Sequence, residues 1–149
     1  LIGSIEKRII ALHRSSDASK RLETIPGVGI LGATTIATIV TGPKAFRSCR
    51  YFAAWLGLVQ RQDSTGGQQN VGPISKQGDR YLRRILVVGA HAVLRRARQH
   101  PEKYPWLTQL LARRPFKVVA VALANKMARI AWALLAKGGT YRAPQLAAA

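Results

Sequence analysis

Apolar residues recur along most of the chain at the three- and four-residue spacing of helices that bury one face. This pattern predicts helices over residues 1–12, 22–40, 43–57, 76–98, 102–112 and 115–137, with a tight turn inside the second. No segment shows a convincing strand pattern. The predicted fold class is therefore all-α: a compact helical domain that contains a helix-hairpin-helix element and a long basic helix after a serine-containing loop.

The turn inside the second segment reads Pro26-Gly27-Val28-Gly29, with apolar residues on both sides. Glycine permits backbone conformations that other residues resist, and the free N–H groups at a helix start can hold a phosphate. The turn resembles the hairpin of a helix-hairpin-helix motif, which binds the nucleic-acid backbone without reading bases. We therefore predict phosphate contacts at Gly27, Val28 and Gly29. The alternative is a turn that only packs two helices together.

A polar segment and a basic helix follow. Residues 60–72 read QRQDSTGGQQNVG, with few apolar side chains and a glycine pair, so we predict a loop. The helix expected at 76–98 rotates by about 100° per residue, which brings its basic side chains into a sector of about 60°. The members of this basic face are Arg80, Arg84, His91, Arg95 and Arg98, with Arg83 beside them.

Composition strengthens the case for a polyanionic partner. The 149 residues contain 24 Lys and Arg against 6 Asp and Glu, a formal net charge of +18. Such an excess opposes compaction, and nucleic acid is the first candidate to neutralise it. The basic residues are spread along the chain, which disfavours a membrane surface; a ribosomal or scaffold protein is a third interpretation.

Other features of composition set bounds on the protein. The hydrophobic share of 48% suffices for one domain with a core. A single cysteine, Cys49, allows no internal disulfide and suits a reducing cytoplasm. The longest apolar run, near 118–124, is too short to span a membrane.

Ser75 separates the loop from the basic helix and has two interpretations. Serine is a favoured N-cap residue, so its role could be to cap the helix. Alternatively, Ser75 is a nucleophile aimed at a nucleic-acid phosphate. Gly72 and Gly78 would leave room for an approaching backbone, and Lys76 and Arg80 would add two cations beside the phosphodiester under attack.

A serine nucleophile needs a base that takes its proton. Asp79 and Asp63 are candidates, although each also has an ordinary interpretation, as a first-turn acid and a solvated loop acid. A base from outside the chain is a third source. The few carboxylates are too scattered for a two-metal site, and the histidines lack metal-ligand spacing. We therefore expect no metal site in this chain.

Three runs of sequence resemble one protein family: IPGVG before a helix, then YFAAWLGLVQRQDSTGG, then VGPISKQGDRYLRRILVVGA. They resemble the C-terminal domain of the IS110, IS116 and IS902 family of bacterial insertion-sequence transposases, over about residues 22–144. The most specific part is the pattern G-x-I-S-K-x-G-x-x-x-L-R, which is complete from Gly72 to Arg83.

This resemblance implies a DNA recombinase. Members of the family carry an N-terminal RuvC-like domain with an acidic, Mg²⁺-binding DEDD centre, then a coiled coil, then a transposase domain whose serine forms a covalent phosphoserine link to DNA. A structured bridge RNA specifies the target and donor DNA. The acidic centre of one subunit meets the serine of another, so a homo-oligomer is implied. By position, Ser75 matches the nucleophile, and the surrounding signature is matched by Lys76, Gly78, Arg80 and Arg83.

The resemblance also implies an organisation. Residues 1–20 are expected to be the end of the coiled coil or a linker helix, 21–144 the transposase domain, and 145–149 a tail that is either native or vector-derived. Within the domain, the helix-hairpin-helix element is expected at 22–57, the serine loop and basic helix at 58–98, and the C-terminal helices at 102–137. The acidic domain is absent from this chain, so the expected Mg²⁺ belongs to that domain and no cofactor is expected here.

Two functions compete on this sequence. The first is the catalytic domain of a transposase in the bacterial cytoplasm, associated with the nucleoid, with Ser75 as nucleophile and Asp79 as a candidate base. Its predicted DNA- or RNA-binding residues are Gly27, Val28, Gly29, Lys76, Gly78, Arg80, Arg83, Arg84, Arg95 and Arg98. The second is a non-catalytic helix-hairpin-helix module that holds DNA or structured RNA while chemistry happens elsewhere.

Overall fold

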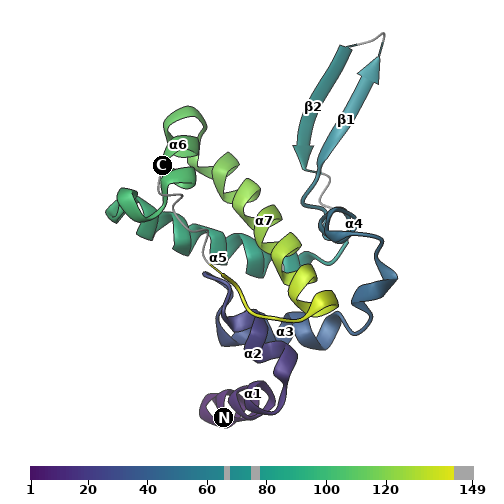
Figure 1. Ribbon diagram of the computed structural model, residues 1–149, viewed down its shortest axis with the longest axis vertical. Helices are drawn as coiled ribbons and strands as arrows, with labels where there is room; N and C mark the ends of the chain where they lie inside the picture. Colours follow the sequence, from purple (N-terminus) through teal and green to yellow (C-terminus); the bar gives the residue numbers. More distant parts are fainter. Residues whose placement is uncertain (66–67, 75–77, 143–149) are drawn as a thin grey trace.

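The computed structural model describes residues 1–65, 68–74 and 78–142 and is built mainly of helices (Figure 1). Its α-helices are α1 (Ile2–Ser15), α2 (Asp17–Glu23), α3 (Gly29–Ile39), α4 (Cys49–Trp55), α5 (Arg80–Gln99), α6 (Pro105–Arg113) and α7 (Phe116–Lys137). Short 3-10 helices, η1 (Pro43–Ala45) and η2 (Pro101–Lys103), and two strands, β1 (Gln60–Thr65) and β2 (Gln68–Ile74), complete the description. The predicted all-α class is confirmed for the body of the domain. The tail at 145–149 lies outside the described residues.

The last helix, α7, is the centre of the domain. It carries apolar residues on nearly all sides and packs against α5, α4, α2 and α6. The indole N–H of Trp132 donates to the carbonyl oxygen of Pro43 at 2.7 Å, which ties α7 to η1. By length and mean hydropathy α7 could cross a membrane, but half of the apolar window is buried inside the protein. We therefore interpret it as the core helix of the domain.

A β-hairpin occupies the segment that we predicted to be a loop. β1 and β2 pair antiparallel, with Asp63 opposite Asn70 and Thr65 opposite Gln68. The loop prediction is wrong because both strands have polar sequences that lack alternating apolar residues, although the glycine pair between them is typical of hairpins. The hairpin projects away from the helical body next to α4 (Figure 1).

Helix α1 leaves its apolar stripe exposed. The side chains of Ile2, Ile5 and Leu12 are 76%, 53% and 57% exposed, whereas His13 is buried. The chain bends at Ser16, whose Oγ accepts a hydrogen bond from the backbone N–H of Ser19 at 3.1 Å and caps α2. The exposed stripe is compatible with the end of a coiled coil, which stays a prediction.

Candidate nucleic-acid interface

The segment that contains the serine is anchored on its C-terminal side by Gly78. Ser75 and Lys76 themselves lie outside the described residues. Gly78 has a φ of +91°, and a Cβ at this position would lie 1.7 Å from the carbonyl oxygen of Trp55. Only glycine fits this conformation and this contact. The space that the sequence suggested for an approaching nucleic acid is therefore filled at Gly78 by the end of α4.

Helix α5 begins at Arg80, whereas the sequence pattern predicted a start at Lys76. Oδ1 of Asp79 accepts a hydrogen bond from the backbone N–H of Leu82 at 2.9 Å, so Asp79 is the N-cap. The predicted start is wrong because Gly78 has a left-handed backbone and Asp79 an extended one. This result removes the N-cap interpretation of Ser75 and gives the Asp79 carboxylate a structural role.

Arg83 reaches back to α4. Its Nη1 donates to the carbonyl oxygen of Leu56 at 3.1 Å, and the side chain is half-buried. Leu58 follows the end of α4, and its carbonyl oxygen accepts a hydrogen bond from Nδ2 of Asn125 in α7 at 3.0 Å. We predicted a nucleic-acid contact for Arg83, and the structure gives it an internal contact. Together with Gly78, it fastens the start of α5 to the end of α4.

The outer face of α5 is basic, as its helical spacing predicted. Arg80, Arg84 and Arg95 are exposed. Both ion pairs found among the described residues involve a histidine as the basic partner. These arginines therefore have no carboxylate partner in the described part of the chain. Their charges remain available to a polyanion, whose counterions such side chains displace.

Two other members of the basic face contact an aromatic ring. Cζ of Arg98 lies 4.4 Å from the centroid of the Phe116 ring. The ring of His91 meets the same ring edge-on, with 5.3 Å between centroids. Arg98 stays exposed, so this cation–π contact orients its guanidinium without removing it from solvent. His91 is half-buried and packs α5 against the start of α7.

The glycine turn between α2 and α3 is present, and most of it faces the protein. A Cβ on Gly27 would lie 2.7 Å from the carbonyl oxygen of Gly89 in α5 and 2.8 Å from Cγ2 of Val93. Val28 is buried, whereas Gly29 is exposed and has nothing within 4 Å of an added Cβ. The turn thus packs closely on α5. Of the three predicted phosphate contacts, Gly29 is the exposed one, and phosphate binding there stays a prediction.

Every predicted site residue, from Gly27 to Arg98, falls inside one match to a known family. Residues 19–105 match the model described as Transposase IS116/IS110/IS902 family. The chain belongs to this family.

Curated relatives of this transposase-family chain extend well beyond it. A "Probable family 20 transposase" of Pseudomonas aeruginosa is 50% identical over 142 residues, which cover 95% of this chain and 42% of the relative. The "Transposase for insertion sequence element IS1111A" of Coxiella burnetii is 39% identical over 142 residues, 95% of this chain and 39% of the relative. The "Transposase for insertion sequence element IS1328" of Yersinia enterocolitica is 40% identical over 141 residues, 94% of this chain and 42% of the relative. The chain spans about two fifths of the length of these relatives.

A hydrogen-bonded group of a serine, a histidine and a glutamate lies away from the predicted site of this transposase-family chain. Nδ1 of His13 lies 2.7 Å from Oγ of Ser19, and Nε2 of His13 lies 2.7 Å from Oε2 of Glu23. Ser19 Oγ also lies 3.3 Å from the hydroxyl of Thr34 in α3. Ser19 is 0% exposed, so no substrate can reach it. These hydrogen bonds fasten α1 to α2 and α3. The sequence did not predict this group, because its members come together only through the bend at residue 16.

Candidate ligands for a metal ion are sparse in the described part of this chain. Among the residues that the structure describes, no three His, Cys, Asp or Glu side chains gather closely enough to hold one. The described residues therefore offer no ligand set for a Mg²⁺ ion.

Proposed function

We propose that this chain is the serine-bearing domain of an insertion-sequence transposase, in which Ser75 attacks a DNA phosphodiester. The observation that carries the proposal is the family match over residues 19–105. That match encloses the complete pattern from Gly72 to Arg83. The role of the serine rests on the resemblance of this pattern to the family signature.

In the proposed reaction, Oγ of Ser75 forms a bond to phosphorus while the bond from phosphorus to the departing sugar oxygen breaks. A base takes the serine proton, and the departing oxygen receives a proton in turn. The phosphate gains charge in the transition state, and the exposed guanidinium groups of Arg80 and Arg84 would stabilise that charge. The product is a phosphoserine link, which the hydroxyl of another strand end would resolve by the reverse steps.

The anchoring of the flanking backbone supports this proposal, because a nucleophile must be positioned to within a fraction of an ångström. Ile74 ends β2 on one side of the serine. Gly78 is pressed against Trp55 on the other side, next to the hydrogen bond from Arg83 to Leu56. The α4–α5 junction would thus present the serine from a rigid base.

The base is proposed to come from another subunit. The Asp79 carboxylate already accepts a hydrogen bond from the backbone of α5, which makes it a poor candidate for a proton acceptor. The resemblance implies an acidic RuvC-like domain that would supply the missing carboxylates with their Mg²⁺. A homo-oligomer, DNA and a structured guide RNA are partners in this proposal, and the bacterial cytoplasm is its setting.

A second candidate is a non-catalytic module that holds DNA or structured RNA. The exposed arginines of α5 favour it to the same degree, because Arg80, Arg84 and Arg95 would bind a phosphate backbone whether or not Ser75 reacts.

Substitution of Ser75 separates the two functions. In the transposase with its acidic domain, we expect Ser75→Ala to abolish strand cleavage while DNA binding is retained, because alanine keeps every cationic side chain. Ser15→Ala, an exposed serine at the end of α1, is the matched control and should cleave normally. Cleavage by the Ser75→Ala protein would leave the binding module as the better account.

A further inference from the structure

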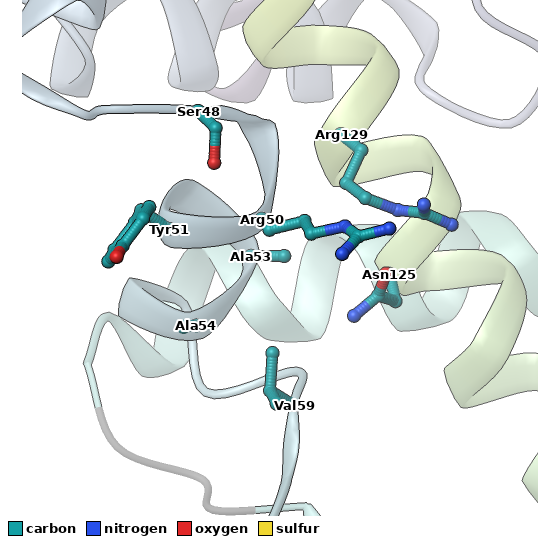
Figure 2. Close-up of a pocket in the computed structure, with 8 residues that line it drawn as sticks. All are labelled: Ser48, Arg50, Tyr51, Ala53, Ala54, Val59, Asn125 and Arg129. Atoms are coloured by element: carbon teal, nitrogen blue, oxygen red, sulfur yellow. The ribbon is translucent and has the colours of Figure 1, made fainter.

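A pocket lies outside the predicted site, between α4 and α7 and next to the start of the β-hairpin. Its volume is about 640 Å³, within the range of roughly 300–1,000 Å³ that is common for ligand sites. Ser48 and Arg50 line it at the start of α4, and Asn125 and Arg129 line it from α7 (Figure 2). Val59, directly before β1, closes one side.

The described lining of this pocket contains two arginines and no carboxylate. Figure 2 shows Arg50 reaching from α4 towards α7, where Asn125 and Arg129 project from successive turns. Nε of Arg129 is buried and has no hydrogen-bond partner. A buried N–H group without an acceptor costs free energy. With two guanidinium groups and no carboxylate in its described lining, the pocket suits an anionic ligand that offers several acceptor oxygens.

Two uncharged side chains add donors to the pocket. Ser48 holds the N-cap position of α4 but makes no capping hydrogen bond, so its hydroxyl is available to a ligand. Asn125 is held in place by its hydrogen bond to the carbonyl oxygen of Leu58, and a second N–H of the amide remains. Guanidinium, hydroxyl and amide donors together are typical of contacts to phosphate oxygens.

We propose that this Arg50–Arg129 pocket binds a phosphodiester group of a nucleic-acid backbone. The volume exceeds what a single phosphate needs, which leaves room for the adjoining sugars. Tyr51, 54% exposed, lies on the lining and offers an aromatic face on which an unpaired base can stack. The proposal goes beyond the serine chemistry, because it needs neither Ser75 nor cleavage.

The pocket lies on the same helix, α4, as the contact that anchors the serine-bearing segment. Arg50 and Trp55 lie on the same helix, roughly 8 Å apart along its axis, and the Trp55 carbonyl is the contact that anchors Gly78. A strand held in the pocket would thus be fixed relative to the serine-bearing segment by one short, rigid helix. We infer that the pocket sets where the strand lies on the domain, separately from the basic face of α5.

The test compares two variants that remove the same charge. The probes are a fluorescein-labelled DNA duplex and a labelled RNA hairpin, measured by fluorescence anisotropy across a range of salt concentrations. The pocket variant is Arg50→Gln/Arg129→Gln, and the control is Arg8→Gln/Arg14→Gln, two exposed arginines of α1. We expect the pocket variant to bind at least one probe about tenfold more weakly than the control does. For DNA, its salt slope should also fall by about 0.9, because the variant neutralises one phosphate fewer.

The probe that responds identifies the source of the phosphodiester, DNA or RNA. Equal affinities of the two variants for both probes would overturn the proposal, because total charge alone would then govern binding. Circular dichroism shows whether the pocket variant has folded.

A measurement on the unsubstituted chain does not depend on any variant. The Nε–H signal of Arg129 in a ¹⁵N-edited NMR spectrum should shift and saturate as either unlabelled probe is added. An unshifted Arg129 signal, while the signals of exposed arginines on α5 move, would contradict the pocket. The Ser75→Ala protein should show the same Arg129 shift, so failure of this site and failure of the serine chemistry are distinguishable.

Discussion

Replacement of Gly78 by alanine should loosen the junction that carries the serine segment. The added Cβ would lie 1.7 Å from the carbonyl oxygen of Trp55, whereas close carbon–oxygen contacts are normally no shorter than about 3.3 Å. A left-handed backbone costs an alanine roughly 1–2 kcal/mol, and separating a packed contact adds roughly 1–3 kcal/mol. We therefore expect the free energy of unfolding to fall by about 2–5 kcal/mol, a large share of the ~5–15 kcal/mol of a typical domain.

Gly29→Ala is the matched control for this experiment. Gly29 also has a positive φ, +65°, but an added Cβ would have nothing within 4 Å. Its substitution should therefore cost only the backbone term, about 1–2 kcal/mol. Urea denaturation of the chain, followed by circular dichroism, gives both values from the midpoints and slopes. Equal destabilisation of the two variants would refute the close contact between Gly78 and α4.

Three further predictions concern capping, charge and burial. Asp79→Ala should lower the free energy of unfolding by about 0.5–2 kcal/mol because it removes the cap, and Asp79→Asn should largely restore it in the same urea titration. Joint replacement of Arg80, Arg84 and Arg95 by glutamine should flatten the salt dependence of DNA binding by about 0.9 for each phosphate that is no longer neutralised; an unchanged slope would move the interface elsewhere. His13→Ala should cost about 1–3 kcal/mol because it removes the hydrogen bonds of the imidazole to the buried Ser19 hydroxyl and to Glu23, which thermal denaturation would detect; a wild-type midpoint would contradict the buried network.

Helix positions could be read from the sequence wherever packing follows the apolar spacing. The predicted helix at 115–137 matches α7, and Gly138, with a φ of 80°, ends it. The basic face of α5 could also be predicted, because the exposed side of a helix follows from its rotation per residue.

The start of α5 and the β-hairpin could not be read from spacing. The start of α5 depends on the contact between Gly78 and α4, which joins residues far apart in sequence. The hairpin strands have polar sequences, so no apolar alternation marked them. In both cases the secondary structure depends on tertiary contacts or on backbone geometry, which the pattern of apolar side chains does not encode.

The sites themselves were predictable to different extents. The pattern around Ser75 is a contiguous run of twelve residues, so the sequence alone shows it. The Arg50–Arg129 pocket depends on how α4 packs against α7, and the inward position of Gly27 depends on the close approach of Gly89. Spacing along the chain carries no information about either arrangement.

The most direct test of the proposed chemistry is to trap the covalent link between protein and DNA. A protein that joins this chain to the proposed acidic domain would be mixed with a suicide DNA substrate that releases its departing strand, and the adduct would be digested and mapped by mass spectrometry. We predict a nucleotide attached through phosphate to Ser75, and no adduct with Ser75→Ala. Efficient strand cleavage with no adduct at Ser75, or with the adduct on another residue, would contradict the proposed role of this serine.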